Sequence, residues 1–92
     1  MAKIVSTHLL PDKILYVEYN DGITGELDLK KLANKPQYSK LNDQEYLESF
    51  TVDSKSGDIV WEGMEPLCKN ALYRQFELKN MMKRLKISDE LL

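Results

Sequence analysis

The sequence predicts an α+β domain: a small, largely antiparallel β-sheet with short helices and a longer C-terminal helix. Three observations predict this class. Segments near the N-terminus alternate apolar and polar residues, an Asp-Gly turn separates two of them, and a long helical pattern covers about 67–86. The 92 residues fit one domain, 1–92, with a core expected over about 4–76.

Three strands are predicted in the N-terminal third. The first is Lys3–Leu10, which Pro11 and Asp12 interrupt. The second is Ile14–Tyr19, which is rich in β-branched and aromatic residues and has a period of two. The third, Ile23–Leu29, follows the Asp-Gly pair, which is a strong hairpin signal. We therefore expect a hairpin with its apolar side chains on one face.

Short helices are predicted in the middle of the chain. Leu29–Ala33 fits one helical turn, which Pro36 ends. We expect Asn42 to cap a second helix over Asp43–Glu48, because Glu45 occupies the capping-box position three residues later.

A second hairpin and the C-terminal helix complete the prediction. Phe50–Val52 is expected to pair with Asp58–Trp61, and Glu62–Pro66 forms a loop. The helix then runs from Leu67 to about Lys86, and Ser88–Leu92 is expected to be a tail.

Composition excludes several classes of function. The net charge is −2, so no overall basic field attracts nucleic acid. The charge is uneven, however, with −5 over residues 1–68 and +3 over residues 69–92. Cys68 is the only cysteine, which rules out an internal disulfide or a cysteine-based zinc site. With no segment typical of a signal peptide or membrane span, we expect a cytoplasmic protein without membrane partners.

A series of short motifs resembles a known family. The motifs are Pro11-Asp12, Asp21-Gly22, Asp28-Leu29, Leu41-Asn42-Asp43, Val52 through Trp61, Leu67-Cys68 and Leu72-Tyr73. In this order and spacing they resemble the small, mostly bacterial family called domain of unknown function 2442, over roughly residues 4–75. One departure is the loop after Trp61, where the family often has Pro-Asn-Gly and an aspartate.

The resemblance implies an α+β fold and no established activity. Members of that family often lie beside another small uncharacterised protein, as toxin–antitoxin components do, and some are joined to a helix-turn-helix. These associations imply an antitoxin-like or regulatory component but no mechanism.

No catalytic, metal-binding or cofactor-binding group emerges from the residue pattern. His8 is the only histidine, and nothing places it beside Cys68 as a catalytic dyad would require. Cys68 precedes Lys69 near a predicted helix start, which favours a reactive thiol, although free cysteines are more often buried. We expect both residues to be structural or inert, and we expect no cofactor.

Two further clusters are candidate sites. Asp21, Glu26 and Asp28 could serve metal-assisted hydrolysis if they converged, but a turn and a polar strand face explain them better. Tyr16, Tyr19 and Trp61 could stack bases of a single-stranded nucleic acid, but packing in strands explains them better.

The C-terminal helix has apolar residues on two nearly opposite sides. The first stripe consists of Leu72, Tyr73 and Phe76, and the second stripe consists of Leu78, Met81, Met82 and Leu85. Because a helix on one small sheet buries a single side, we expect the first stripe to dock and the second to need another cover. Three covers are possible: a fold-back near residues 77–80, a second copy of the chain, or a different protein.

We therefore predict a non-enzymatic protein-interaction module that binds through its C-terminal helix. Covering four such side chains would contribute roughly 6–10 kcal/mol before ordering costs. The predicted partner-binding residues are Leu78, Met81, Met82, Leu85, Arg74 and Lys83. The partner is another protein or a second copy. The alternatives are a nucleic-acid-binding accessory protein that uses the basic C-terminal segment and, less favoured by the residue pattern, an uncharacterised enzyme.

Overall fold

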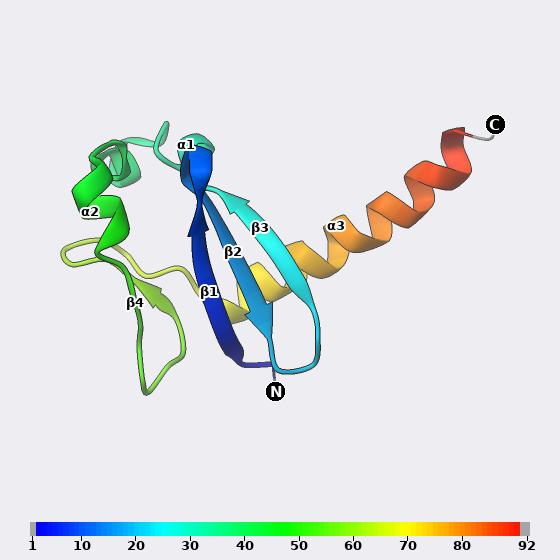
Figure 1. Ribbon diagram of the computed structural model, residues 1–92, viewed down its shortest axis with the longest axis horizontal. Helices are drawn as coiled ribbons and strands as arrows, with labels where there is room; N and C mark the ends of the chain where they lie inside the picture. The colour runs from blue at the N-terminus through cyan, green and yellow to red at the C-terminus, as the bar shows by residue number, and fades with distance from the viewer. Residues whose placement is uncertain (1, 91–92) are drawn as a thin grey trace.

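The computed structural model describes the fold of residues 2–90 and side chains as far as Lys83. It confirms the predicted α+β class (Figure 1). In chain order the elements are β1 (Ile4–Leu10), a 3₁₀ turn (Pro11–Lys13), β2 (Ile14–Tyr19), β3 (Thr24–Asp28), α1 (Leu29–Leu32), a 3₁₀ helix (Pro36–Asn42), α2 (Gln44–Glu48), β4 (Thr51–Val52), β5 (Ile59–Val60) and α3 (Lys69–Glu90).

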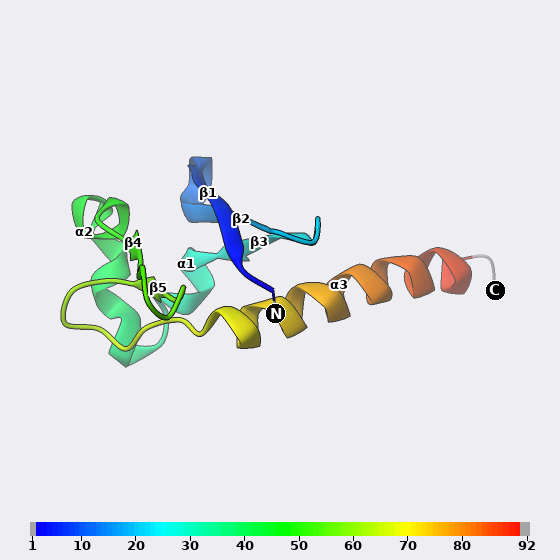
Figure 2. The same cartoon turned by 90° about the horizontal axis from the view of Figure 1, so that it is seen from below.

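The main sheet is antiparallel, with strand order β1-β2-β3. Val17 lies opposite Thr7 on one side and Gly25 on the other. Leu15, Val17 and Tyr19 are buried on the inner face of the sheet, and the first turns of α3 pass beneath this face, next to Tyr19 (Figure 2). The alternating residues of β2 lie on the opposite face, which the described residues leave open. The period of two in the sequence thus separates a covered face from an open one.

Both predicted turns around β2 are present. Gly22 has φ 91°, a conformation that glycine adopts without strain, and Asp21 Oδ1 accepts the N–H of Ile23 at 3.0 Å. On the other side of β2, Asp12 and Lys13 also have positive φ, at 64° and 58°. The break after Pro11 is therefore a tight left-handed turn.

The second layer of the core gathers around Trp61. This side chain is 1% exposed, and its indole N–H donates to the carbonyl oxygen of Leu47 at 2.9 Å. Leu41, Leu47 and Ile59 are buried with it, so that the short helices and the β4–β5 hairpin share one core with the main sheet. The second hairpin is confirmed, with Thr51 opposite Val60.

The predicted cap of the second helix was wrong by one residue. Asp43, not Asn42, is the N-cap, and its Oδ1 accepts the N–H of Glu45 at 3.1 Å. Asn42 is instead the last residue of the 3₁₀ helix, which the sequence pattern did not predict. Aspartate and asparagine cap helices about equally well, so local preference alone does not distinguish the two neighbours.

The C-terminal helix differs from its prediction at both ends. It begins at Lys69 because Leu67 forms an antiparallel bridge with Ile59 and so extends the second hairpin. Asp58 Oδ1 then accepts the N–H of Lys69 at 3.0 Å. The helix continues through Glu90, so the predicted tail from residue 88 is helical, and only positions 91–92 of it lie outside the described residues. No glycine or proline occurs after Pro66 to end the helix earlier.

Candidate interaction surface on the C-terminal helix

The first half of α3 is fixed to the sheet by its first stripe, as predicted. Leu72 and Phe76 are 5% and 1% exposed. The Phe76 ring lies directly against Gly25 of β3, so closely that a Cβ at this glycine would fall 2.1 Å from the ring. This close approach requires glycine at position 25, and the docking of α3 on the sheet depends on that residue.

Two tyrosines determine the position of the helix along the sheet. The Tyr19 hydroxyl donates to the carbonyl oxygen of Lys69 at 2.8 Å, at the first residue of α3. One turn later, the Tyr73 hydroxyl donates to Asp21 Oδ2 at 2.5 Å, which connects the helix to the β2–β3 turn. The two rings meet edge-on, with centroids 5.0 Å apart. Together these contacts hold the start of α3 in one orientation.

The same contacts shift three pKa values. Burial raises the pKa of Tyr19 to about 12. The hydrogen bond to the Asp21 carboxylate raises the pKa of Tyr73 to about 12, and it lowers the pKa of Asp21 below its ordinary value. These groups are therefore in their usual charge states at neutral pH, and their role is to anchor the helix.

The second stripe lies on the side of α3 that faces away from the sheet. Leu78, Met81 and Met82 are 57%, 55% and 57% exposed, while Leu85 lies outside the described side chains. The helix has no break near residues 77–80, so the predicted possibility of a fold-back is wrong (Figure 1). The rest of the helix extends beyond the sheet.

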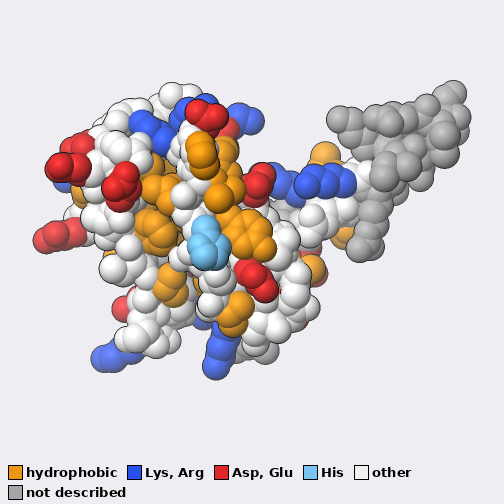
Figure 3. All heavy atoms as spheres, in the orientation of Figure 1, with side chains coloured by type: hydrophobic (Ala, Val, Ile, Leu, Met, Phe, Trp, Pro, Cys, Tyr) orange, Lys and Arg blue, Asp and Glu red, His pale blue; other side chains and the backbone are white. Residues whose placement is uncertain are grey.

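Charged side chains surround the second stripe. Arg74, Lys79 and Lys83 are exposed, and Glu77 adds one carboxylate among them. Figure 3 shows basic side chains beside hydrophobic ones where α3 leaves the sheet. Apolar side chains within a charged rim are typical of surfaces that bind other proteins.

His8 and Cys68 lie on opposite sides of the main sheet. His8 is exposed on the open face, bonded to Ser6 and stacked on Tyr16 with ring centroids 6.0 Å apart. Cys68 is exposed immediately before α3, on the side of Tyr19. The structure therefore does not bring the two together, and it exposes the thiol, while the neighbouring Leu67 packs against the core.

Asp21, Glu26 and Asp28, which could have formed a metal site, lie in three different local environments. Asp21 supports the β2–β3 turn, as described above. Asp28 caps α1, since its Oδ1 accepts the N–H groups of Lys30 and Lys31, a role that the strand pattern did not predict. Glu26 is exposed on the open face. Among the described residues, no group of three or more potential ligands gathers around a point.

The three aromatic residues that could have stacked bases do not form a platform. Tyr19 and Trp61 are each 1% exposed, whereas Tyr16 lies on the opposite face of the sheet. Packing in the core explains Tyr19 and Trp61, and Tyr16 stacks on His8. No helix in the described part of the chain is long and apolar enough to cross a membrane.

One known protein family matches most of the chain. Residues 4–77 match the family described as Protein of unknown function (DUF2442). The chain belongs to this family. Searches of the curated proteins and of the solved structures found no match. In this DUF2442 chain the matched region contains the sheet and the docked half of α3, and it ends one residue before Leu78, where the second stripe begins.

Sequence reasoning found the two stripes but missed the contact that positions them. The signal was present, since Gly25 is the only small residue in the inward-facing row of β3. A glycine inside a strand pattern often marks a close approach by another element. That Phe76 is the approaching side chain follows only from the tertiary structure.

Proposed function

We propose that this domain is a non-enzymatic protein-interaction module that binds a partner protein through the second stripe of α3. The single observation that supports this most directly is the exposure of Leu78, Met81 and Met82, each more than half accessible on a helix whose other side is buried. Methionine side chains adapt to irregular partner surfaces, which fits such a role.

The energetics indicate how large the partner surface is. Leu78, Met81 and Met82 are already about half covered in the free domain. Burying the exposed half of these three side chains would contribute roughly 2–5 kcal/mol to the free energy of binding. Association costs about 4 kcal/mol or more in lost freedom, so these three contacts do not hold a complex alone. The partner therefore also contacts the charged rim, including Arg74 and Lys83, both of which are exposed. The rim is mainly basic, which favours a partner with an acidic surface.

The biological form we propose for this binding is an antitoxin-like or regulatory component in a bacterial cytoplasm. The family resemblance supports this form, and the single thiol fits a reducing compartment. The adjacent gene product is the natural first partner to examine, and a second copy of the chain is the other.

Light scattering on the purified chain, alone and mixed with the adjacent gene product, tests the proposal. We expect a complex larger than one protomer in one of the two samples. Met82→Asp should weaken it by at least about tenfold, because a charge would be buried at the contact. Met82→Ala should also weaken the complex. Because alanine favours the helix, this weakening would report the lost side-chain contact and not a loss of helical structure.

A matched control is available on the sheet. Val5 is 58% exposed on β1, almost the same as Met82, and β1 is the edge of the sheet opposite β3. Val5→Asp should leave association unchanged. A strictly monomeric wild type in both samples, or equal effects of the Val5 and Met82 substitutions, would contradict the proposal.

A further inference from the structure

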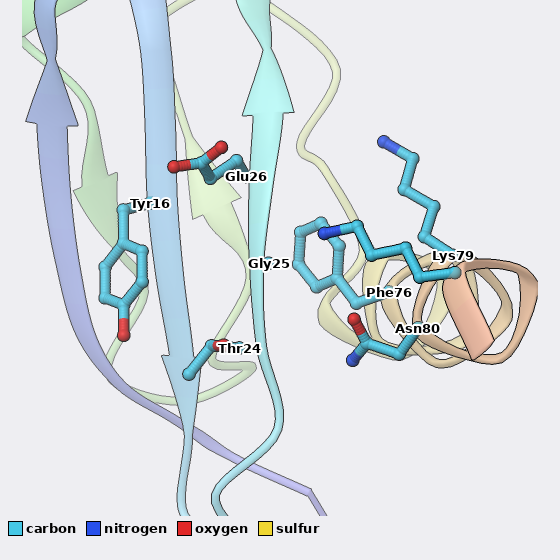
Figure 4. A pocket seen from close by; sticks show the side chains of 8 residues that line it. Tyr16, Thr24, Gly25, Glu26, Phe76, Lys79 and Asn80 are labelled. Carbon is cyan, nitrogen blue, oxygen red and sulfur yellow. The ribbon is translucent and has the colours of Figure 1, made fainter. Parts of the chain in front are cut away.

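A groove of about 480 Å³ lies between the free edge of β3 and the part of α3 that leaves the sheet. Figure 4 shows Thr24, Gly25 and Glu26 on the strand side, with Phe76, Lys79 and Asn80 reaching toward them from the helix. Lys83 also lines the groove. This site lies on a different side of α3 from the second stripe.

The strand side of the groove offers unpaired backbone groups. β3 is an edge strand of the sheet. The N–H of Tyr19 donates to the carbonyl oxygen of Ile23 at 2.8 Å, so these two residues form a hydrogen-bonded pair. Because such pairs alternate along an antiparallel ladder, Thr24 and Glu26 point their N–H and C=O groups away from β2 and into the groove. An edge of this kind can pair with another strand.

The helix side of the groove is positively charged. Lys79 and Lys83 are exposed, and Asn80 between them is uncharged. Figure 4 shows the Glu26 carboxylate turned over the sheet, away from Lys79. The one acidic residue of the groove wall therefore does not neutralise the lysine side.

The Phe76 ring and the continuing helix form the bottom of the groove beneath the free edge of β3. Gly25 has no side chain, and the Phe76 ring fills the space directly below it. From there α3 continues past the edge of the sheet, so that Lys79, Asn80 and Lys83 lie next to the place a fourth strand would take. Side chains on one face of that strand would point toward the lysines.

We propose that this groove binds an extended acidic peptide segment, which adds to β3 as a fourth antiparallel or parallel strand while alternate carboxylates pair with Lys79 and Lys83. Main-chain hydrogen bonds to Thr24 and Glu26 supply the general affinity, and the lysines supply the preference for acidic side chains. This binding shares Lys79 and Lys83 with the charged rim of the second stripe but uses none of its apolar residues, so Met82→Asp, which should leave peptide binding unchanged, separates it from the proposed function.

The test is an NMR titration of the isotope-labelled full chain with a synthetic peptide of about eight residues that alternates threonine and glutamate. We expect saturable shifts of the Thr24, Glu26, Lys79 and Lys83 amides. Lys79→Glu combined with Lys83→Glu should weaken binding at least about tenfold, and added salt should weaken it in the wild type. The control Lys55→Glu reverses an exposed charge in the β4–β5 turn and should have no effect.

Two peptide controls separate strand addition from simple charge attraction. An alternating threonine–lysine peptide should not bind, and neither should the acidic peptide with alternate backbone amides methylated, because it keeps its charge but loses its donors. Equal binding by the methylated peptide, shifts confined to residues outside the groove, or no shifts at saturating peptide would overturn the proposal.

Discussion

Replacing Gly25 by alanine is the sharpest test of how α3 is held. The added Cβ would lie 2.1 and 2.2 Å from two carbons of the Phe76 ring, far inside van der Waals contact. The ring is 1% exposed and belongs to a helix that Tyr73 and Tyr19 also hold, so it has little freedom to move. Either the ring leaves its site or the helix shifts.

The expected cost lies between two known effects. Overpacking a core costs about 1–3 kcal/mol, and losing a buried phenylalanine entirely costs about 3–5 kcal/mol. We therefore expect Gly25→Ala to lower the free energy of unfolding by about 2–4 kcal/mol. Urea unfolding followed by the fluorescence of Trp61, which is buried and the only tryptophan, measures this value.

A double-mutant cycle decides whether the clash is the cause. In a Phe76→Ala background the space that the ring occupied below Gly25 is free, and alanine is favoured over glycine in a strand by about 0.5–1 kcal/mol. There, Gly25→Ala should be neutral or slightly stabilising, which gives a coupling of at least about 2 kcal/mol. If Gly25→Ala costs the same in both backgrounds, or less than about 0.5 kcal/mol in the wild type, the reasoning is refuted.

Three further predictions concern the anchors and caps. Tyr73→Phe should raise the pKa of Asp21 toward its ordinary value in an NMR titration. A lowered carboxyl pKa stabilises the fold only at higher pH, so the free energy of unfolding should fall less steeply in this variant than in the wild type as pH decreases. Because the pKa of Tyr19 rises from 10.0 to about 12 on folding, urea midpoints should fall as pH rises through that window, and Tyr19→Phe should flatten this decline. Asp43→Ala should cost about 1 kcal/mol in urea unfolding, and Asn42→Ala clearly less, because only the aspartate accepts a backbone N–H at the helix start.

Local patterns predicted most of the secondary structure. The β2–β3 hairpin follows from alternation and an Asp-Gly turn, which act within a few residues. The 3₁₀ helix over Pro36–Asn42 has no periodic pattern and was missed. The start of α3 was misplaced by two residues because Leu67 pairs with Ile59, a contact between segments that the sequence does not show as neighbours.

The candidate surfaces were predictable only in part, for a related reason. The two stripes follow from helical periodicity alone, so the residue pattern was enough to predict the exposure of Met82. The groove was not predictable in this way, because it depends on where Phe76 meets Gly25 and on which strand of the sheet is an edge. Both are properties of the assembled fold.

The part of α3 beyond the sheet carries two surfaces of different chemistry. Toward the edge of β3 it presents Lys79 and Lys83, and away from the sheet it presents Leu78, Met81 and Met82. Salt separates them, because screening weakens ion pairs but leaves apolar burial nearly unchanged. Complexes held through the second stripe should therefore weaken only in part at high salt, as the contacts of the charged rim are screened, whereas peptide binding in the groove should be lost.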